Sequence, residues 1–212
     1  MRHLARFLAT VAVAAVLAAT DASAEASHHR TGWYAGLGFG PARGSVWLTG
    51  LDDPIIERTG SSPQIRAGRM LDRRFGLGIE AQTWFVEGGT IGDDVILQLK
   101  ARFTGHLWAL AGTWYPGDTG FWRGFFMRAG AGPAIANYAI AIPDPEDPES
   151  GQELQTRIDE WGWGLVAAVG WEVPVSPHFA AGVQFSSNHL WIGDNLDRLW
   201  FGAPVVHLGW NF

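Results

Sequence analysis

A short segment near the C-terminus contains the residue types of a hydrolytic triad. Its candidate nucleophiles, base and carboxylates are Ser186, Ser187, His189, Asp194 and Asp197. A serine hydroxyl, an imidazole and a carboxylate in contact can cleave an ester or amide bond, because the imidazole takes the hydroxyl proton and the carboxylate orients the imidazole. On a β-strand, however, Ser187 and His189 share a face with Phe185, whereas Ser186 points to the opposite face. Geometry decides whether such groups react, and we expect no catalytic residue here.

Four charged residues form a second candidate site. Glu80, Lys100, Arg102 and Arg128 lie on three consecutive segments, at positions that we predict to face inward. An unpaired charge inside a protein is costly, so we expect Glu80 to pair with at least one of the cations. The group could be the charged constriction of a pore or a hydrogen-bonded network that fills the interior.

The histidines show no spacing suited to a metal ion. His28 and His29 are adjacent near the N-terminus, and the later ones fall on separate segments, at His106, His178, His189 and His207. The chain has no H-x-x-x-H motif and no cysteine, so thiolate sites and disulfides are excluded. The acidic stretch from Pro143 to Glu153 lacks the spacing of a calcium loop. We therefore expect no metal site and no cofactor.

The N-terminus has the pattern of an export signal. Arg2 and Arg6 precede an apolar run from Phe7 to Ala19, and Ala22-Ser23-Ala24 offers small residues for cleavage. The run is shorter than the roughly 20 residues that a transmembrane helix needs. We predict a cleaved signal peptide over residues 1–24 and one mature domain over residues 25–212.

The chain ends in an alternation of apolar residues that reaches the last position. Val206, Leu208, Trp210 and Phe212 are separated by single residues, so on a strand they share one face. A strand that faces lipid needs such a face, whereas a soluble protein gains little from a terminal Phe. With the export signal, this pattern indicates a β-barrel of the bacterial outer membrane.

Eight segments carry the alternation that such a barrel requires. They are Gly32–Trp47, Gln64–Leu71, Phe75–Glu87, Val95–Ala109, Gly124–Ala141, Ile158–Val173, Phe179–Trp191 and Leu199–Phe212. In the fourth segment we assign Phe103, Leu107 and Ala109 to the lipid face and Thr104 and His106, with the two cations, to the interior. Pro133 predicts a bulge or irregularity in the fifth. The fold class predicted is all-β: an eight-stranded antiparallel transmembrane barrel with up-and-down meander topology.

Connections alternate between short and long. The short ones are Asp72–Arg74, Tyr115–Gly120 and Pro174–His178, and the long ones are Leu48–Pro63, Gly88–Asp94, Ile142–Thr156 and Ile192–Arg198. Outer-membrane barrels have short periplasmic turns and longer external loops, so this order predicts a multi-pass protein with both termini in the periplasm.

The composition agrees with this architecture. Twelve Trp and twelve Phe suit aromatic girdles at the two membrane interfaces, and 28 Gly suit strongly curved, closely packed strands. The net charge of −6 gives no electrostatic basis for binding nucleic acid.

Two motifs resemble those of a known group. Gly32-Trp33-Tyr34-Ala35-Gly36-Leu37-Gly38 resembles the first strand of small outer-membrane barrels related to the OmpA transmembrane domain and the opacity proteins, and residues 170–179 are similar to their last periplasmic turn. The ending also resembles the signal that the outer-membrane assembly machinery recognises. The resemblance spans the mature chain and implies the architecture. The group includes structural anchors, adhesins, small-solute channels and a few enzymes.

A narrower resemblance concerns Ser187-Asn188, which is similar to part of the motif of the outer-membrane lipid A deacylases of the PagL type. In that family a His stands two residues before the catalytic Ser, and a Glu completes the triad. Here the matching position is Phe185, so the usual general base is missing. The resemblance implies a deacylase only if His189 replaces that base.

These patterns predict an integral outer-membrane barrel with a non-enzymatic envelope or surface-interaction role and an interior filled by side chains. A narrow small-solute channel is one alternative, based on Lys100, Arg102 and Arg128, and a lipid A acyl hydrolase is another. The expected partners are outer-membrane lipid, lipopolysaccharide and the assembly machinery, the last through the strand that ends in Phe212. The sequence identifies no partner for the loops.

Overall fold

The computed structural model describes residues 32–48, 54, 56–87, 100–117, 119, 122–143, 153–193 and 196–212. The predicted signal peptide lies outside these residues. The strands are β1 (Gly32–Leu48), β2 (Ile56–Met70), β3 (Phe75–Glu87), β4 (Lys100–Trp114), β5 (Phe125–Pro143), β6 (Glu153–Ser176), β7 (Phe179–Ile192) and β8 (Leu196–Asn211). In this part of the chain no helix is long and apolar enough to cross a membrane.

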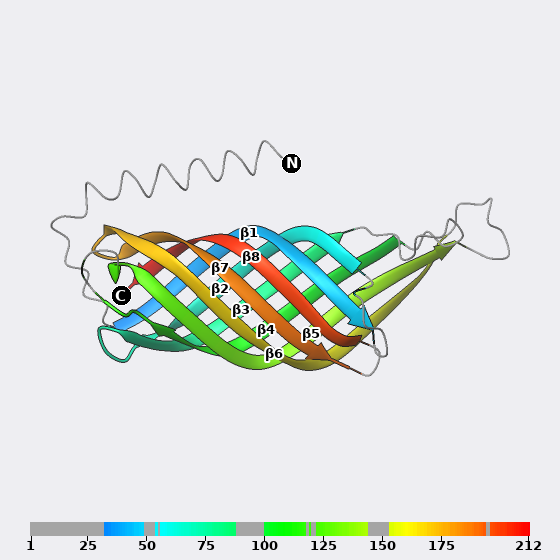
Figure 1. Ribbon diagram of the computed structural model, residues 1–212, viewed down its shortest axis with the longest axis horizontal. Helices are drawn as coiled ribbons and strands as arrows, with labels where there is room; N and C mark the ends of the chain where they lie inside the picture. The colour runs from blue at the N-terminus through cyan, green and yellow to red at the C-terminus, as the bar shows by residue number, and fades with distance from the viewer. Residues whose placement is uncertain are drawn as a thin grey trace.

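The strands form one closed antiparallel barrel. Each strand pairs with the next in the chain, and β1 pairs with β8 to close the sheet (Figure 1). The last hydrogen bond of the closure runs from the Phe212 N–H to the Trp33 carbonyl oxygen, at 2.9 Å. The predicted eight-stranded meander is therefore confirmed.

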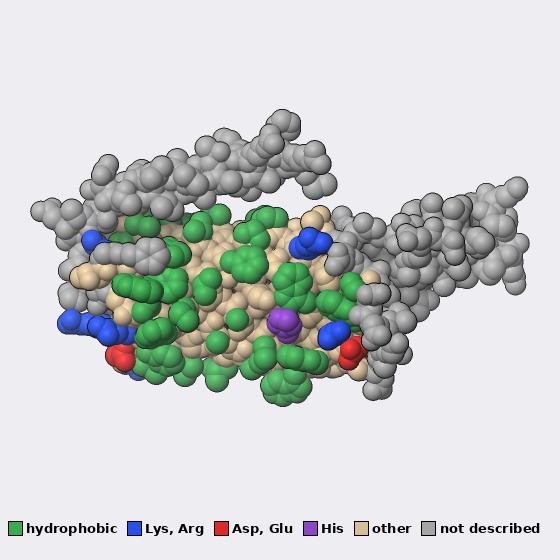
Figure 2. Space-filling view, in the orientation of Figure 1, with side chains coloured by type: hydrophobic (Ala, Val, Ile, Leu, Met, Phe, Trp, Pro, Cys, Tyr) green, Lys and Arg blue, Asp and Glu red, His purple; other side chains and the backbone are tan. Residues whose placement is uncertain are grey.

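Side-chain alternation sets the two faces of the wall, as predicted for β1, β3 and β8. On β1 the outward side chains of Trp33 and Leu37 are 62 % and 61 % exposed. On β3, Ile79 points outward, whereas Glu80 and Gln82 are buried inside. The apolar alternation of β8 up to Phe212 also faces outward. Figure 2 shows the consequence: hydrophobic side chains cover the middle of the wall, and charged side chains gather near its two ends.

The predicted faces of β4 are wrong. Phe103, Leu107 and Ala109, which we assigned to lipid, are buried inside the barrel, whereas Thr104 and His106 lie on the outer face. The alternation of apolar and polar residues in β4 predicted the wrong faces because one half of the interior is itself apolar. An apolar position therefore does not identify the lipid side. The side chains of Lys100 and Arg102 lie outside the described residues, so their predicted inward placement stays a prediction.

Several strands are longer than predicted. β2 begins at Ile56 instead of Gln64, and its ladder with β1 continues from Ala42↔Gly60 to Val46↔Ile56. Backbone pairing needs no apolar side chain, so a mainly polar stretch that we predicted to be a loop remains in the sheet. β6 likewise begins at Glu153 and ends at Ser176.

Pro133 causes an interruption without a register shift. The β4–β5 pairing stops after Leu107↔Ala134 and resumes at Leu110↔Ala131 in the same register. A proline has no N–H to donate, so a gap in the ladder is expected at this position. The predicted irregularity is present, but no residue is inserted as in a bulge.

An apolar block fills one half of the interior. Trp84, Phe103 and Phe201 are almost completely buried, and the Trp84 and Phe201 rings stack with centroids 4.7 Å apart and planes 8° apart. The Phe103 ring also stacks with that of Phe201, with centroids 6.0 Å apart. Eight strands leave an interior only wide enough for side chains, and these rings occupy it.

Candidate functional site

A polar cluster fills the other half of the interior, and its centre is the side chain of Arg128 on β5. The guanidinium donates from Nη1 to Glu80 Oε2 at 2.9 Å and from Nη2 to Gln184 Oε1 at 3.0 Å. Its Nε donates to Thr113 Oγ1 at 3.3 Å. Arg128 and Glu80 are buried, so this ion pair is shielded from water. The expectation that Glu80 pairs with a cation is confirmed.

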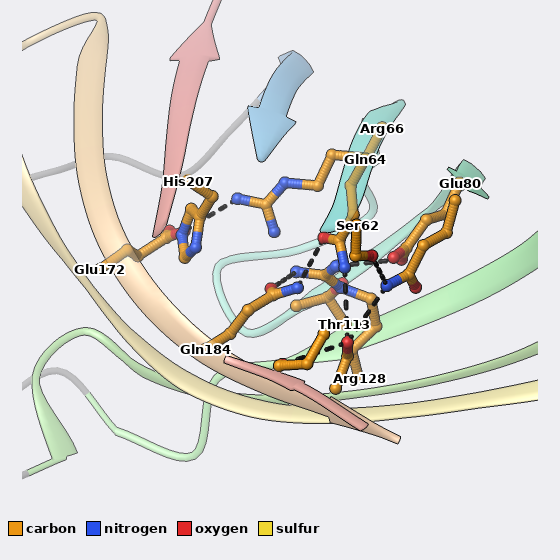
Figure 3. Close-up of polar contacts among 12 residues, drawn as sticks. Ser62, Gln64, Arg66, Glu80, Thr113, Arg128, Glu172, Gln184 and His207 are labelled. Carbon is orange, nitrogen blue, oxygen red and sulfur yellow. Dashed lines mark hydrogen bonds and ion pairs between the residues drawn. The ribbon is translucent and has the colours of Figure 1, made fainter. Parts of the chain in front are cut away.

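Amide and hydroxyl groups extend this centre across the lumen. Gln184 Nε2 donates to Gln64 Oε1 at 2.7 Å, and Gln64 Nε2 donates to Ser186 Oγ at 3.4 Å. Gln82 Nε2 donates to Ser62 Oγ at 2.9 Å and to Ser186 Oγ at 3.2 Å. These bonds join β2, β3 and β7 across the interior, and Figure 3 shows the side chains converging from opposite walls.

A second, part-buried ion pair lies beside the first. Arg66 Nη2 donates to Glu172 Oε2 at 3.3 Å, and the Tyr115 hydroxyl donates to Glu172 Oε1 at 2.9 Å. His207 Nε2 lies 3.5 Å from Glu172 Oε2. The guanidinium carbons of Arg128 and Arg66 lie 5.2 Å and 5.8 Å from the centroid of the Phe126 ring, within range of a cation–π attraction.

The cluster therefore pairs the buried Arg128 and the part-buried Arg66 with two buried carboxylates and leaves little space. The cavity beside it measures about 20 Å³ and is lined by Tyr34, Arg66, Tyr115 and Glu172, among others. That volume suits about one water molecule. The arrangement can hold the walls of the barrel together, but it offers no room for a substrate.

Sequence reasoning found only part of this cluster. It identified Glu80 and Arg128 but missed Arg66, Glu172 and His207. For Arg66 the signal was present, since it alternates with the outward residues Ile65 and Ala67.

The two serine candidates lie on opposite sides of the wall, and His189 shares the outer side with Ser187. Ser186 is buried in the lumen within the glutamine network. Ser187 lies on the outer face, where its Oγ accepts a hydrogen bond from Trp200 Nε1 at 2.9 Å. His189 also points outward, and its ring lies 6.4 Å from that of Trp191. Among the described residues no hydrogen bond joins either serine to His189.

The carboxylates of the proposed triad add nothing to this site. Asp194 lies outside the described residues. Asp197 is half-exposed, with Oδ2 3.9 Å from Arg198 Nε. The described part of the chain also holds no group of three or more His, Asp or Glu that could bind a metal ion. His28 and His29 are outside the described residues, and His106 is hydrogen-bonded to Thr83 Oγ1 on the outer face, at 3.0 Å.

Comparisons with known proteins agree with the fold. Residues 10–212 match the family model described as an outer membrane protein beta-barrel domain. The structure of Neisserial surface protein A is similar with a TM-score of 0.50 and 14 % identity, over 86 % of this chain and 98 % of that one. Ail, the attachment invasion locus protein of Yersinia pestis, gives a TM-score of 0.49 and 12 % identity, over 86 % and 99 % of the two chains. A search of curated proteins gave no match.

Proposed function

The chain belongs to the outer membrane β-barrel family, and we propose that it serves in the bacterial outer membrane as a non-enzymatic envelope protein, whose filled barrel anchors an external interaction surface. The observation that carries this proposal is the filled interior. The polar cluster around Arg128 and the aromatic block around Phe201 occupy successive levels of the lumen. A barrel packed in this way acts as an anchor.

The shape of one hairpin supports the interaction surface. β5 and β6 stay paired as far as Pro143↔Glu153, whereas the pairing of β6 with β7 starts only at Gly162↔Ile192. The β5–β6 hairpin therefore continues past the neighbouring strand, and Figure 1 shows it projecting beyond the barrel. We propose that this end faces the outside, where lipopolysaccharide and surface partners are met.

The opposite end, with the short turns, then faces the periplasm. The start of β1 and the end of β8 lie together at this end, because the Phe212 N–H bonds to the Trp33 carbonyl. Phe212 is exposed there and stacks against Trp210, with centroids 6.0 Å apart. An accessible aromatic terminus suits the proposed recognition by the assembly machinery.

Two alternatives are less well supported. A narrow channel would need a continuous path, and the described interior leaves a cavity of only about 20 Å³ beside its polar cluster. A lipid A hydrolase would need a base beside a serine. Ser187 faces outward as a hydrolase of membrane lipid would require, but its hydroxyl is bonded to Trp200 and not to His189.

Orientation can be tested cleanly because the chain contains no cysteine. Single-cysteine variants Thr156→Cys, in the projecting part of β6, and Arg73→Cys, in the β2–β3 turn, would be treated in intact cells with a maleimide that does not cross the outer membrane. We expect labelling of the first variant only. Labelling of Arg73→Cys alone would reverse the proposed orientation.

The absence of hydrolysis is tested on lipid A itself. Mass spectra of lipid A from cells that express the wild type and Ser187→Ala should be identical, with folding verified by the heat-dependent shift in gel mobility. Loss of an acyl chain in the wild type but not in Ser187→Ala would contradict the proposal and make the protein an enzyme.

A further inference from the structure

A long apolar groove crosses the outer wall of the barrel. Its volume is about 710 Å³, and it spans the strands from β3 to β7. The groove follows the hydrogen-bonding direction of the sheet. Its floor consists of small residues paired in successive registers, namely Gly112, Ala129, Ala167 and Ser187.

One wall of the groove consists of large side chains in the adjoining row. They are also paired strand by strand, and they are Phe75, Trp114, Met127, Val169 and Phe185. All five are between 38 % and 49 % exposed. In the membrane this surface faces hydrocarbon, so the groove suits a flexible apolar chain.

The groove climbs from one rim of the barrel toward the middle of the bilayer. Phe75 is the first residue of β3, and Gly112 is close to the end of β4, at the rim with the short turns. Ser187 lies well inside β7. Four steps of about 4.8 Å between strands give a length of about 19 Å, and at an inclination of roughly 45° the groove rises about 13 Å. One leaflet of the hydrocarbon core is about 15 Å thick, so the groove fits within a single leaflet.

The lower end of the groove is cationic. Arg73 and Arg74 are exposed in the turn that leads directly into Phe75. Arg69 is also exposed, and Leu77, its partner on β3, pairs with Gly112 of the groove floor. The acid of this turn, Asp72, accepts backbone N–H groups of Arg74 and Phe75 at 2.6 and 2.8 Å. The turn is thus held in place with an excess of positive charge beside the apolar groove.

We propose that the groove and its arginines bind one anionic diacyl phospholipid of the periplasmic leaflet, with an acyl chain in the groove and the phosphate beside Arg73 and Arg74. The leaflet assignment rests on the orientation proposed above. A headgroup at the rim and a chain that rises into the bilayer match the order of charge and apolar surface along the groove. Guanidinium groups near a membrane surface favour anionic over zwitterionic headgroups.

Native mass spectrometry of the purified barrel tests this site. The probe is a mixture of equal amounts of phosphatidylglycerol, phosphatidylethanolamine and lipid A, supplied in detergent micelles. We expect the wild type to retain one phosphatidylglycerol. Arg73→Ala with Arg74→Ala should lower that retention about tenfold, because two cations near the phosphate are lost. Ala129→Leu, which fills the floor, should lower the retention of phosphatidylglycerol and phosphatidylethanolamine alike.

Matched controls keep the test specific. Ala67→Leu enlarges an outward alanine of β2 away from the groove, and Arg198→Ala removes an exposed arginine at the other rim. Neither should change lipid retention. If Ala129→Leu does not fold, Ala167→Leu replaces it. Equal retention in all variants, no retained lipid, or preference for lipid A would overturn the proposal.

Failure of the site and failure of the proposed orientation give different results. Retention of phosphatidylglycerol in micelles does not depend on which rim faces the periplasm. External labelling of Arg73→Cys would therefore overturn the leaflet assignment while the headgroup preference stayed measurable. The opposite result is also possible. If the wild type shows no preference for phosphatidylglycerol while Arg73→Cys is protected from the external maleimide, the lipid site is overturned and the proposed orientation stands.

Discussion

At the scale of single residues, the interior is held by ion pairs that are deeply buried. Arg128 contacts Glu80, Gln184 and Thr113, which come from three other strands. A buried pair contributes little net stability over an apolar pair, because both charges are desolvated. Removal of one partner is strongly destabilising, because the remaining charge stays buried without an opposite charge beside it.

The first prediction concerns this pair. Arg128→Ala should lower the free energy of unfolding by about 3 kcal/mol, because it leaves Glu80 buried and unpaired. Arg128→Met with Glu80→Gln should recover most of that loss. Urea unfolding of the barrel in lipid vesicles, followed by tryptophan fluorescence, measures both. A single variant as stable as the wild type would show that water reaches the lumen.

The sequence predicts whether a residue faces inward or outward better in the polar half of the interior than in the apolar half. Glu80 was placed correctly because β3 alternates between apolar outward and polar inward positions. Phe103 and Leu107 were placed wrongly because their level of the interior is apolar, and apolar side chains then occur on both faces. The pairing of Arg66 with Glu172 was not predictable, since it joins strands far apart in the sequence.

At the scale of strands, close backbone approach limits which residues the wall accepts. Gly132, next to Pro133, packs against the backbone of Trp108 on β4, and a Cβ at this position would collide with the Trp108 carbonyl group. Gly209 on β8 is less crowded, with its nearest atoms 3.7 Å or more from a Cβ. Close backbone contact therefore requires a glycine at Gly132 but not at Gly209.

A second prediction follows from that contrast. Gly132→Ala should destabilise the barrel by about 2 kcal/mol through overpacking between β4 and β5, whereas Gly209→Ala should be neutral. The heat-modified gel shift, recorded against temperature, reports the stability of each folded variant. Equal transition temperatures for Gly132→Ala and Gly209→Ala would contradict overpacking, because β4 and β5 would then accommodate the added methyl group without a loss of stability.

A third prediction concerns the closing strand. Deletion of Phe212 removes an exposed aromatic residue and the N–H that bonds to the Trp33 carbonyl. The amount of folded protein in the outer membrane should fall, whereas Phe212→Tyr should preserve it. Quantitative immunoblotting of membrane fractions gives the comparison, and an unchanged yield after deletion would count against a role of the last residue in assembly.

At the scale of the whole molecule, the sequence predicts the architecture better than the role. The alternation of β3 and β8 and the predicted meander order agree with the closed barrel, whereas the signal peptide stays a prediction. The groove from Phe75 to Ser187 was not predicted, because it depends on which residues of five strands fall in register. The register across five strands combines local alternation and turn geometry with the stagger that barrel closure imposes.

The filled interior is the feature that favours the proposed anchor over a channel. The Arg128 cluster and the Trp84–Phe201 stack lie at different levels, so an ion would have to disrupt both to cross. We expect paired charges and stacked rings that fill a narrow barrel to block an aqueous path through the described residues.

Single-channel recording in planar lipid bilayers tests this claim most directly. Folded wild-type protein should give no unitary current steps, whereas a variant with Phe201→Ala and Arg128→Ala, which opens both levels, should conduct. Stable current steps from the wild type, with an ion selectivity that changes in Glu80→Gln, would contradict a filled lumen and identify the protein as a channel.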